Sequence, residues 1–174
     1  MLKHWQSLLN TDCRVAVKDG RTLYPIFKNG STSLFLDADR VLTNHEIVAD
    51  DVTVFIRDPR VRFVQGVNQY CVFNHLDVHE TYQKIKTGDL TDRHFAPQWM
   101  WLLHLYKYHK GTVTLKEMRH MADFTKVHHD KNRFETVEVE PLSEYVSPDM
   151  PLLSHINNTI PLKEIIEDHV LSKA

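Results

Sequence analysis

The stretch from Leu23 to Leu34 restricts the fold of this chain most strongly. A short apolar run ends abruptly at Lys28-Asn29-Gly30, and three hydroxyl residues follow before apolar residues return. This order predicts a β-strand, a tight turn and the start of an α-helix, and Gly30 permits the backbone geometry of the turn. Alternation of strands and helices favours an α/β domain.

The turn is a candidate anion site, because backbone amides at the start of a helix favour negative charge. Lys28 adds a positive charge, and the hydroxyl groups add hydrogen-bond donors. The residues expected to hold the anion are Lys28, Asn29, Gly30, Ser31, Thr32 and Ser33. The nucleotide-triphosphate motif GxxxxGK[ST] is absent. An ordinary loop capped by Ser31 is the alternative interpretation.

A second apolar strand, from Thr53 to Ile56, ends in Arg57-Asp58-Pro59. Pro59 suits the first turn of a helix, and Asp58 suits its N-cap. Arg57 is therefore expected at the carboxyl end of a strand, where open α/β sheets bind ligands. The turn that contains Lys28 and the side chain of Arg57, at two strand ends, can bind two phosphates of one nucleotide.

Together these stretches resemble the sulfotransferases that use 3′-phosphoadenosine 5′-phosphosulfate (PAPS). The segment 24–34 is similar to the family's 5′-phosphosulfate loop, and 54–63 is similar to its 3′-phosphate segment, R-D-P-x-x-R. Residues 94–98, His-Phe-Ala-Pro-Gln, resemble an element of the carbohydrate branch. A weaker match lies at 129–133. The resemblance spans residues 22 to 134 and implies a three-layer, P-loop-like α/β fold with a mostly parallel central sheet flanked by helices.

The resemblance also implies roles for individual residues. Lys28 and the hydroxyl residues would hold the 5′-phosphosulfate, with Lys28 stabilising charge on the leaving phosphate. Arg57 would hold the 3′-phosphate. Arg62 would help, or would form an ion pair with a carboxylate such as Asp58. The donor would be PAPS, the product 3′-phosphoadenosine 5′-phosphate, and no metal is required.

Three residues are candidates for the general base that deprotonates the acceptor. His45 and Glu46 lie between the two donor-binding strands, where branches of the family place a catalytic Glu or His. His94 belongs to the His-Phe-Ala-Pro-Gln element. Glu46 and His94 rank close together, ahead of His45. The alternatives are a solvated surface for His45 and Glu46, and a helix-starting role for His94.

The chain departs from the family pattern at several points. Gln65 stands where the family usually has a serine beside the 3′-phosphate, and its amide can still donate a hydrogen bond. Phe27 replaces the usual proline before the lysine. The chain is also short for the family, so part of the acceptor surface would be missing or supplied by a second copy in a homodimer.

Length and composition indicate one domain of 174 residues, with a loop-rich segment over 128–174. The resemblance implies that the donor-binding core spans about 13–125. A formal net charge of −2 gives no general attraction to nucleic acid or to acidic membranes. Two distant cysteines suggest a reducing compartment. Without a signal peptide or a membrane-spanning run, we expect a soluble, cytoplasmic protein, which within the family points to a bacterial or viral form.

Local signals predict further elements. Asp19-Gly20 is typical of a hairpin turn between strands at 13–18 and 22–27. Helices are expected after Pro59, from Asp77 to Gly88, as a buried aromatic helix within 95–109, and after Pro161. An aromatic platform for a sugar or a base is the alternative interpretation of 95–109. A strand is expected at 112–115, followed by a helix to about Phe124.

The sequence is also compatible with other functions. The chain could be a sulfotransferase-like binding protein without catalysis, or a magnesium-dependent P-loop enzyme, which the absent GK[ST] weighs against. A zinc site at Cys71, His75 and His79 is a further alternative, although it offers three ligands where a closed site normally has four. The acceptor would be a glycan or another small molecule.

Overall fold

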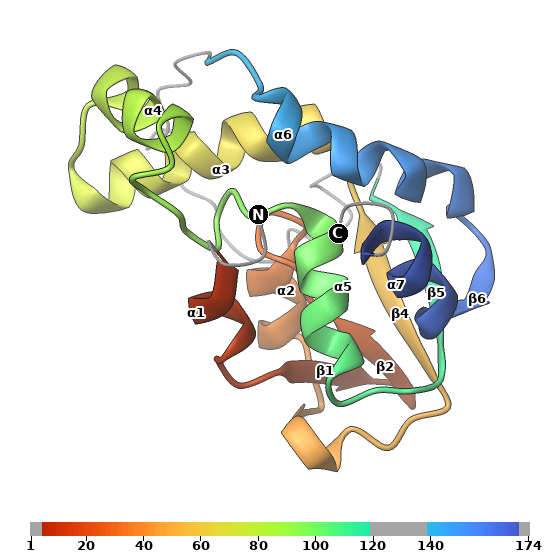
Figure 1. Ribbon diagram of the computed structural model, residues 1–174. Coiled ribbons are helices and arrows are strands. Elements are labelled where there is room, and N and C mark those ends of the chain that lie inside the picture. Colours follow the sequence, from red (N-terminus) through yellow and green to blue (C-terminus); the bar gives the residue numbers. More distant parts are fainter. Residues whose placement is uncertain (1–4, 119–138, 171–174) are drawn as a thin grey trace.

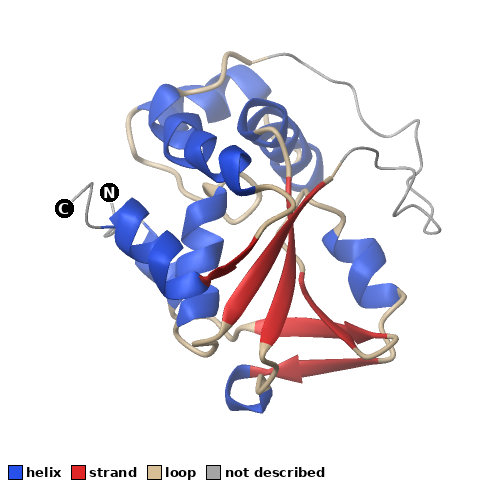
Figure 2. Cartoon of the chain, turned by 90° about the vertical axis from the view of Figure 1, so that its right-hand side faces the viewer, coloured by secondary structure: helices blue, strands red, loops and turns tan. Residues whose placement is uncertain are grey.

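The computed structural model describes residues 5–118 and 139–170 (Figure 1). Within these residues the chain forms an α/β domain around one sheet, with helices on both sides of it (Figures 1 and 2). The expected α/β class, with a central sheet flanked by helices, is therefore confirmed.

The described part of the sheet has six strands in the order β3-β1-β2-β4-β5-β6. Their bounds are β1 Arg14–Lys18, β2 Arg21–Tyr24, β3 Arg40–Thr43, β4 Asp51–Ile56, β5 Thr112–Glu117 and β6 Thr159–Pro161. The central strands β2, β4 and β5 run parallel, whereas β1, β3 and β6 pair antiparallel with their neighbours. The expectation of a mostly parallel sheet thus holds only at the centre, and the sheet is mixed.

The helices connect and cover these strands. They are α1 Gln6–Leu9, α2 Ser31–Leu36, α3 Pro59–Asn74, α4 Val78–Lys86, α5 Gln98–Tyr106, α6 Ser143–Val146 and α7 Leu162–Val170, with the 3₁₀ segments η2 Asn44–Glu46 and η4 Ser147–His155. The apolar helix α5 is buried over most of its length and packs beside α7 (Figure 1).

The chain reverses its direction of travel across the sheet between β2 and β4. After β2 it passes through α2 to β3 on one side, and after β4 it passes through α3, α4 and α5 to β5 on the other side. Connections that leave neighbouring parallel strands in opposite directions open a crevice at their carboxyl ends. Lys28 lies in the loop that follows β2, and Arg57 directly follows β4, so the fold puts both at this point.

Local sequence signals set several element boundaries as expected. Asp19 and Gly20 have φ angles of 50° and 74°, which fits a tight hairpin between β1 and β2. Asp58 caps α3 by accepting a hydrogen bond from the backbone N–H of Arg60 at 2.9 Å. Asp77 caps α4 in the same way, accepting from Glu80 at 2.9 Å. These turns and caps confirm the corresponding predictions.

Other expectations differ from the structure. The second strand ends at Tyr24, before Pro25, rather than at Phe27. Strand β3 lies in the polar stretch after Asp37, which carried no strand signal. The segment 139–161, expected to be loop-rich, contains α6, η4 and β6. The weak family match at 129–133 lies wholly outside the described residues. The helix predicted to extend to Phe124 lies largely outside them.

No helix among the described residues is long and apolar enough to cross a membrane.

Candidate functional site

The loop after β2 is built around a buried asparagine. The side-chain amide of Asn29 donates to the carbonyl oxygen of Phe55 at 2.8 Å and to Oε1 of Gln98 at 2.8 Å. Asn29 is fully buried, so its side chain anchors the loop and does not face a ligand. Lys28 and Gly30 adopt positive φ angles of 70° and 78°, and Gly30 immediately precedes α2. The anchored loop presents Lys28 beside the start of α2.

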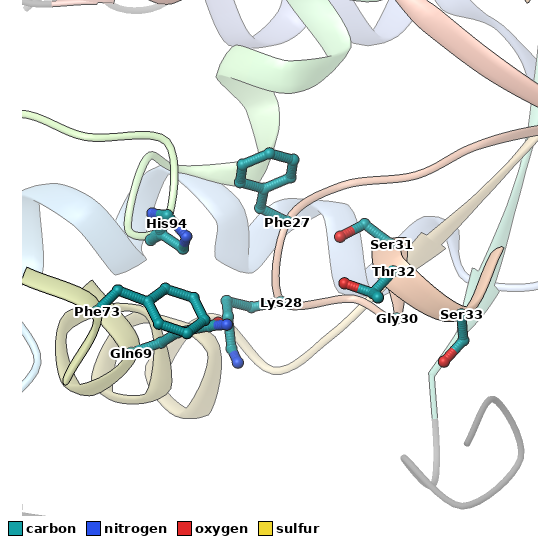
Figure 3. Close-up of a pocket in the computed structure, with 9 residues that line it drawn as sticks. All are labelled: Phe27, Lys28, Gly30, Ser31, Thr32, Ser33, Gln69, Phe73 and His94. Carbon is teal, nitrogen blue, oxygen red and sulfur yellow. The ribbon is translucent and has the colours of Figure 1, made fainter. Parts of the chain in front are cut away.

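Lys28 faces a cavity of about 190 Å³ at this edge of the sheet. Figure 3 shows the hydroxyl groups of Ser31 and Thr32 pointing toward the Lys28 side of this cavity. Its lining comes from the loop, α2, α3 and the segment before α5: Phe27, Lys28, Gly30, Ser31, Thr32, Ser33, Gln69, Phe73 and His94. A cation and several hydroxyl groups around one small cavity suit an anion.

The ammonium of Lys28 lies in an environment that disfavours its charge. Burial, reinforced by the positive charges of Arg57 and Arg62, lowers the pKa of Lys28 from 10.5 to about 8. The ion pairs formed between described residues do not include Lys28. A bound anion would compensate both the burial and the neighbouring cations.

Arg57 contacts the lysine loop directly. Its Nη1 donates to the carbonyl oxygen of Lys28 at 3.0 Å and to Oε1 of Gln65 at 2.7 Å. The backbone of Arg57 is held as well, since its N–H donates to Oε1 of Gln98 at 3.0 Å and its carbonyl accepts from Nε2 of Gln98 at 2.9 Å. Gln65 therefore orients Arg57 through its oxygen in this structure.

Arg57 also lines a second, larger cavity of about 740 Å³ beyond the ends of β4 and β5. Its other walls come from the ends of these strands, the start of α3 and η4: Ile56, Asp58, Val61, Glu117, Met118, Leu153 and Ile156. Lys28 and Arg57 thus line separate cavities, and the two residues are linked by the hydrogen bond from the guanidinium to the Lys28 carbonyl. An anion with two charged groups could place one in each.

Arg62 has a structural role. Its Nε donates to the carbonyl oxygen of Phe27 at 3.0 Å, and its Nη1 donates to the carbonyl oxygen of Ala96. The residue is 2% exposed, and burial lowers its pKa to about 10. Asp58 pairs with Arg60 at 2.9 Å, so the ion pair considered for Arg62 is made by Arg60.

His94 lies in the same cavity as Lys28 and is paired with a carboxylate. Oδ1 of Asp92 lies 2.5 Å from Nδ1 of His94 and accepts the His94 backbone N–H at 2.9 Å. Burial opposes ionisation of Asp92, yet the hydrogen bonds from His94 outweigh it and lower the pKa of this carboxyl group. Because Asp92 occupies Nδ1, Nε2 is the imidazole nitrogen available to a ligand.

A glycine allows the His94 segment to approach α3. A Cβ atom placed on Gly66 would lie 2.0 Å from the carbonyl oxygen of His94 and 3.2 Å from Cα of Phe95. Any side chain at position 66 would push the two segments apart. Gly66 therefore sets how closely the His94 segment approaches α3.

The structure does not bring His45 and Glu46 to this site. Oε2 of Glu46 accepts the backbone N–H of Thr43 at 3.2 Å in a capping box for η2. The His45 ring packs against Tyr108, with ring centroids 5.8 Å apart. Tyr108 follows the last residue of α5, whereas Gln98 at the first residue contacts Arg57. At 1.5 Å per residue, the nine residues of α5 separate these ends by about 13 Å.

The alternative zinc ligands are not collected into a site. Cys71 lies within α3, His75 is its C-cap with a φ of 53°, and His79 belongs to α4, so they do not share one helical face. Among the described residues, no group of three or more His, Cys, Asp or Glu side chains could hold a metal ion.

Several site residues were not recognised from the sequence as such. Gln69 and Phe73 line the Lys28 cavity from α3, and Asp92 precedes His94 by two residues. An isolated glycine in a helical pattern, as at Gly66, is a signal of close packing that could have been used. The sequence carried no comparable signal for Asp149, which contacts the start of α5 from 51 residues away.

Comparisons with protein-family models, with curated proteins and with solved structures found no match to this chain.

Proposed function

We propose that this chain is a sulfotransferase that transfers a sulfuryl group from PAPS to a hydroxyl or amine of an acceptor, of the carbohydrate class. The finer fold assignment, a P-loop-like sulfotransferase domain, belongs to the same proposal. The observation that supports this proposal most strongly is the contact between the lysine loop and Arg57, at the point where the chain reverses its direction across the sheet. Two cationic groups there, each facing its own cavity, suit a donor with two separate phosphate positions.

Lys28 and the hydroxyl residues would bind the 5′-phosphosulfate in the smaller cavity. The ammonium of Lys28 would stabilise the charge that develops on the bridging oxygen as its bond to sulfur breaks. Ser31 and Thr32 would donate to the nonbridging oxygens, since their hydroxyl groups point toward the Lys28 side. Arg57 would bind the 3′-phosphate through the guanidinium N–H groups that remain beyond its contacts with Lys28 and Gln65.

His94 is the base candidate that the geometry favours. It lines the same cavity as Lys28, and Asp92 fixes its Nδ1 so that Nε2 can accept a proton. The acceptor oxygen would form a bond to sulfur, its proton would pass to Nε2, and the electron pair of the broken S–O bond would leave with 3′-phosphoadenosine 5′-phosphate. His45 and Glu46 have no comparable position.

A turnover assay tests this function. PAPS and a panel of glycan acceptors are incubated with wild type and with Lys28→Ala, and formation of 3′-phosphoadenosine 5′-phosphate is measured. We expect acceptor-dependent turnover that Lys28→Ala abolishes. Donor binding without turnover on any acceptor would instead support the noncatalytic nucleotide-binding alternative.

Single substitutions test the base. His94→Gln should abolish turnover while the affinity for 3′-phosphoadenosine 5′-phosphate is retained. His45→Gln and Glu46→Gln serve as controls and should keep near-wild-type turnover. If Glu46→Gln loses turnover and His94→Gln keeps it, the base is Glu46.

A further inference from the structure

A carboxylate from the C-terminal part of the chain lies at the start of α5. Asp149 in η4 is 1% exposed, and its two oxygens accept the backbone N–H groups of Gln98 at 2.6 Å and Trp99 at 2.8 Å. The first N–H groups of a helix have no partner within that helix. Asp149 supplies partners for two of them and so determines where α5 begins.

The side chain of Gln98 joins the two strand ends of the anion site. Its Oε1 accepts from Nδ2 of Asn29 in the lysine loop and from the backbone N–H of Arg57. Its Nε2 donates to the carbonyl oxygen of Arg57. Because Gln98 is fully buried, each of these hydrogen bonds depends on the position of the Gln98 backbone. The spacing between the ends of β2 and β4 is therefore tied to the first residue of α5.

A buried cation, Arg62, also links the lysine loop to the segment before α5. Arg62 links the carbonyl oxygens of Phe27, just before Lys28, and Ala96, just before the start of α5. Burial raises the pKa of Asp149 to about 6, against the lowering effects of the N–H groups and of Arg62. At neutral pH Asp149 is still mainly ionised, so its hydrogen bonds to the helix start are charge-assisted.

We propose that Asp149 is a positioning residue for the anion site and acts through Gln98. By fixing the backbone at the start of α5, it sets the position of the Gln98 amide, which holds the lysine loop and Arg57 at their working separation. The ligand in this proposal is that of the proposed function, whereas the arrangement of Asp149, Gln98 and Asn29 exists without it.

A double-mutant cycle tests the proposal. The variants are Asp149→Asn, Gln98→Ala and their combination, and the measured quantity is the affinity for 3′-phosphoadenosine 5′-phosphate at about pH 7.5. Each single change should weaken binding by about tenfold or more, and the double variant should bind no more weakly than Gln98→Ala alone. Additive losses would overturn the proposal, because Asp149 would then act independently of Gln98.

A matched core variant separates positioning from general destabilisation. Leu152 is fully buried in the same segment, η4, and makes none of these polar contacts. Leu152→Ala should lower the melting temperature and leave the affinity unchanged at a temperature where the protein is folded. An equal loss of affinity in Leu152→Ala would show that Asp149 has only a structural role. If Asp149→Asn does not fold, Asp149→Ser, which retains a hydroxyl acceptor, replaces it in both comparisons.

A ligand-free measurement distinguishes this proposal from the proposed function. The side-chain amide resonances of Asn29 report its hydrogen bond to Gln98, and Asp149→Asn should shift them while Leu152→Ala should not. If wild type fails to bind the nucleotide but the shift occurs, the positioning role stands and the donor assignment fails. Unchanged Asn29 resonances in Asp149→Asn would overturn the positioning role.

Discussion

The guanidinium of Arg57 donates to the carbonyl oxygen of Lys28 at 3.0 Å, so the two cationic residues of the site are linked through one backbone group. Lys28 has a φ of 70°, a left-handed conformation that non-glycine residues seldom adopt. The bond to Arg57 helps to hold this conformation. The arginine thus has two functions in our account: it shapes the lysine loop and it offers its remaining N–H groups to a ligand.

The low pKa of Lys28 predicts a proton-linked affinity. In the free protein Lys28 is about half deprotonated at pH 8, whereas a bound anion would favour the charged ammonium and raise the pKa. Binding of 3′-phosphoadenosine 5′-phosphate should therefore take up a proton at about pH 8.5 and weaken toward about pH 9.5, by up to tenfold per unit. Calorimetry in buffers with different ionisation enthalpies measures this uptake.

Lys28→Arg is the control for this linkage, because an arginine keeps its charge throughout this range. Its affinity should be nearly flat between about pH 7.5 and 9.5. Equal pH dependence in wild type and Lys28→Arg would show that another group is responsible.

Gly66→Ala should disturb the site by displacing the His94 segment. The added Cβ would meet the His94 carbonyl at 2.0 Å, so the His94 segment or α3 must move. We expect a loss of about 1–3 kcal/mol in the free energy of unfolding, as is usual for overpacking, together with reduced turnover. Chemical denaturation and the turnover assay measure the two effects.

A glycine on an exposed turn provides the comparison. Gly20 has no atom within 4 Å of an added Cβ, although its φ of 74° still strains a side chain. Gly20→Asn, which tolerates this φ, should keep full turnover. Full turnover in Gly66→Ala as well would contradict the role given to the close approach.

The buried carboxyl group of Asp149 predicts how stability depends on pH. Its pKa is raised from 3.8 to about 6, so between these values the folded protein binds more protons at this group than the unfolded chain does. The contribution of Asp149 to the free energy of unfolding should therefore rise as pH falls from about 7 to 4.5 and be lost as pH rises through about 6. The magnitude is on the order of 1–3 kcal/mol.

Comparison with Asp149→Asn isolates this group, because the other titrations are common to both proteins. Wild type should gain stability relative to the variant on acidification, as measured by denaturation at each pH. A constant difference across this range would mean that the carboxyl group titrates normally.

The sequence predicted those parts of the fold that neighbouring residues determine. The Asp19-Gly20 hairpin and the caps at Asp58 and Asp77 follow from residue types with strong local preferences, and all three occur. Strand β3 was missed because its residues are mostly exposed or half-buried at the sheet edge and lack an apolar alternation. Its pairing with β1 depends on contacts that local patterns do not contain.

The same distinction, between what neighbouring residues determine and what depends on the folded chain, applies to the candidate site. The two strand ends and their cations could be identified as neighbours, because the ends of parallel strands meet at one edge of a sheet. Three other features could not be predicted from the sequence. They are the burial of Asn29, the pairing of Asp58 with Arg60 in place of Arg62, and the contact of Asp149 with α5. Each depends on which side chains face one another after the chain has folded. The proposal of His45 and Glu46 as bases rests on their side-chain chemistry and on their place in the chain order of the family, neither of which fixes their position in space.

The most direct test of the account is calorimetric binding of 3′-phosphoadenosine 5′-phosphate, without magnesium, to wild type and to Arg57→Ala. Adenosine 5′-phosphate, which lacks the 3′-phosphate, is the matched ligand. We predict micromolar binding of the bisphosphate to wild type, about −8 kcal/mol, and a loss of at least about tenfold in Arg57→Ala, with adenosine 5′-phosphate much less affected. No binding to wild type, or equal binding of the two nucleotides, would contradict the account.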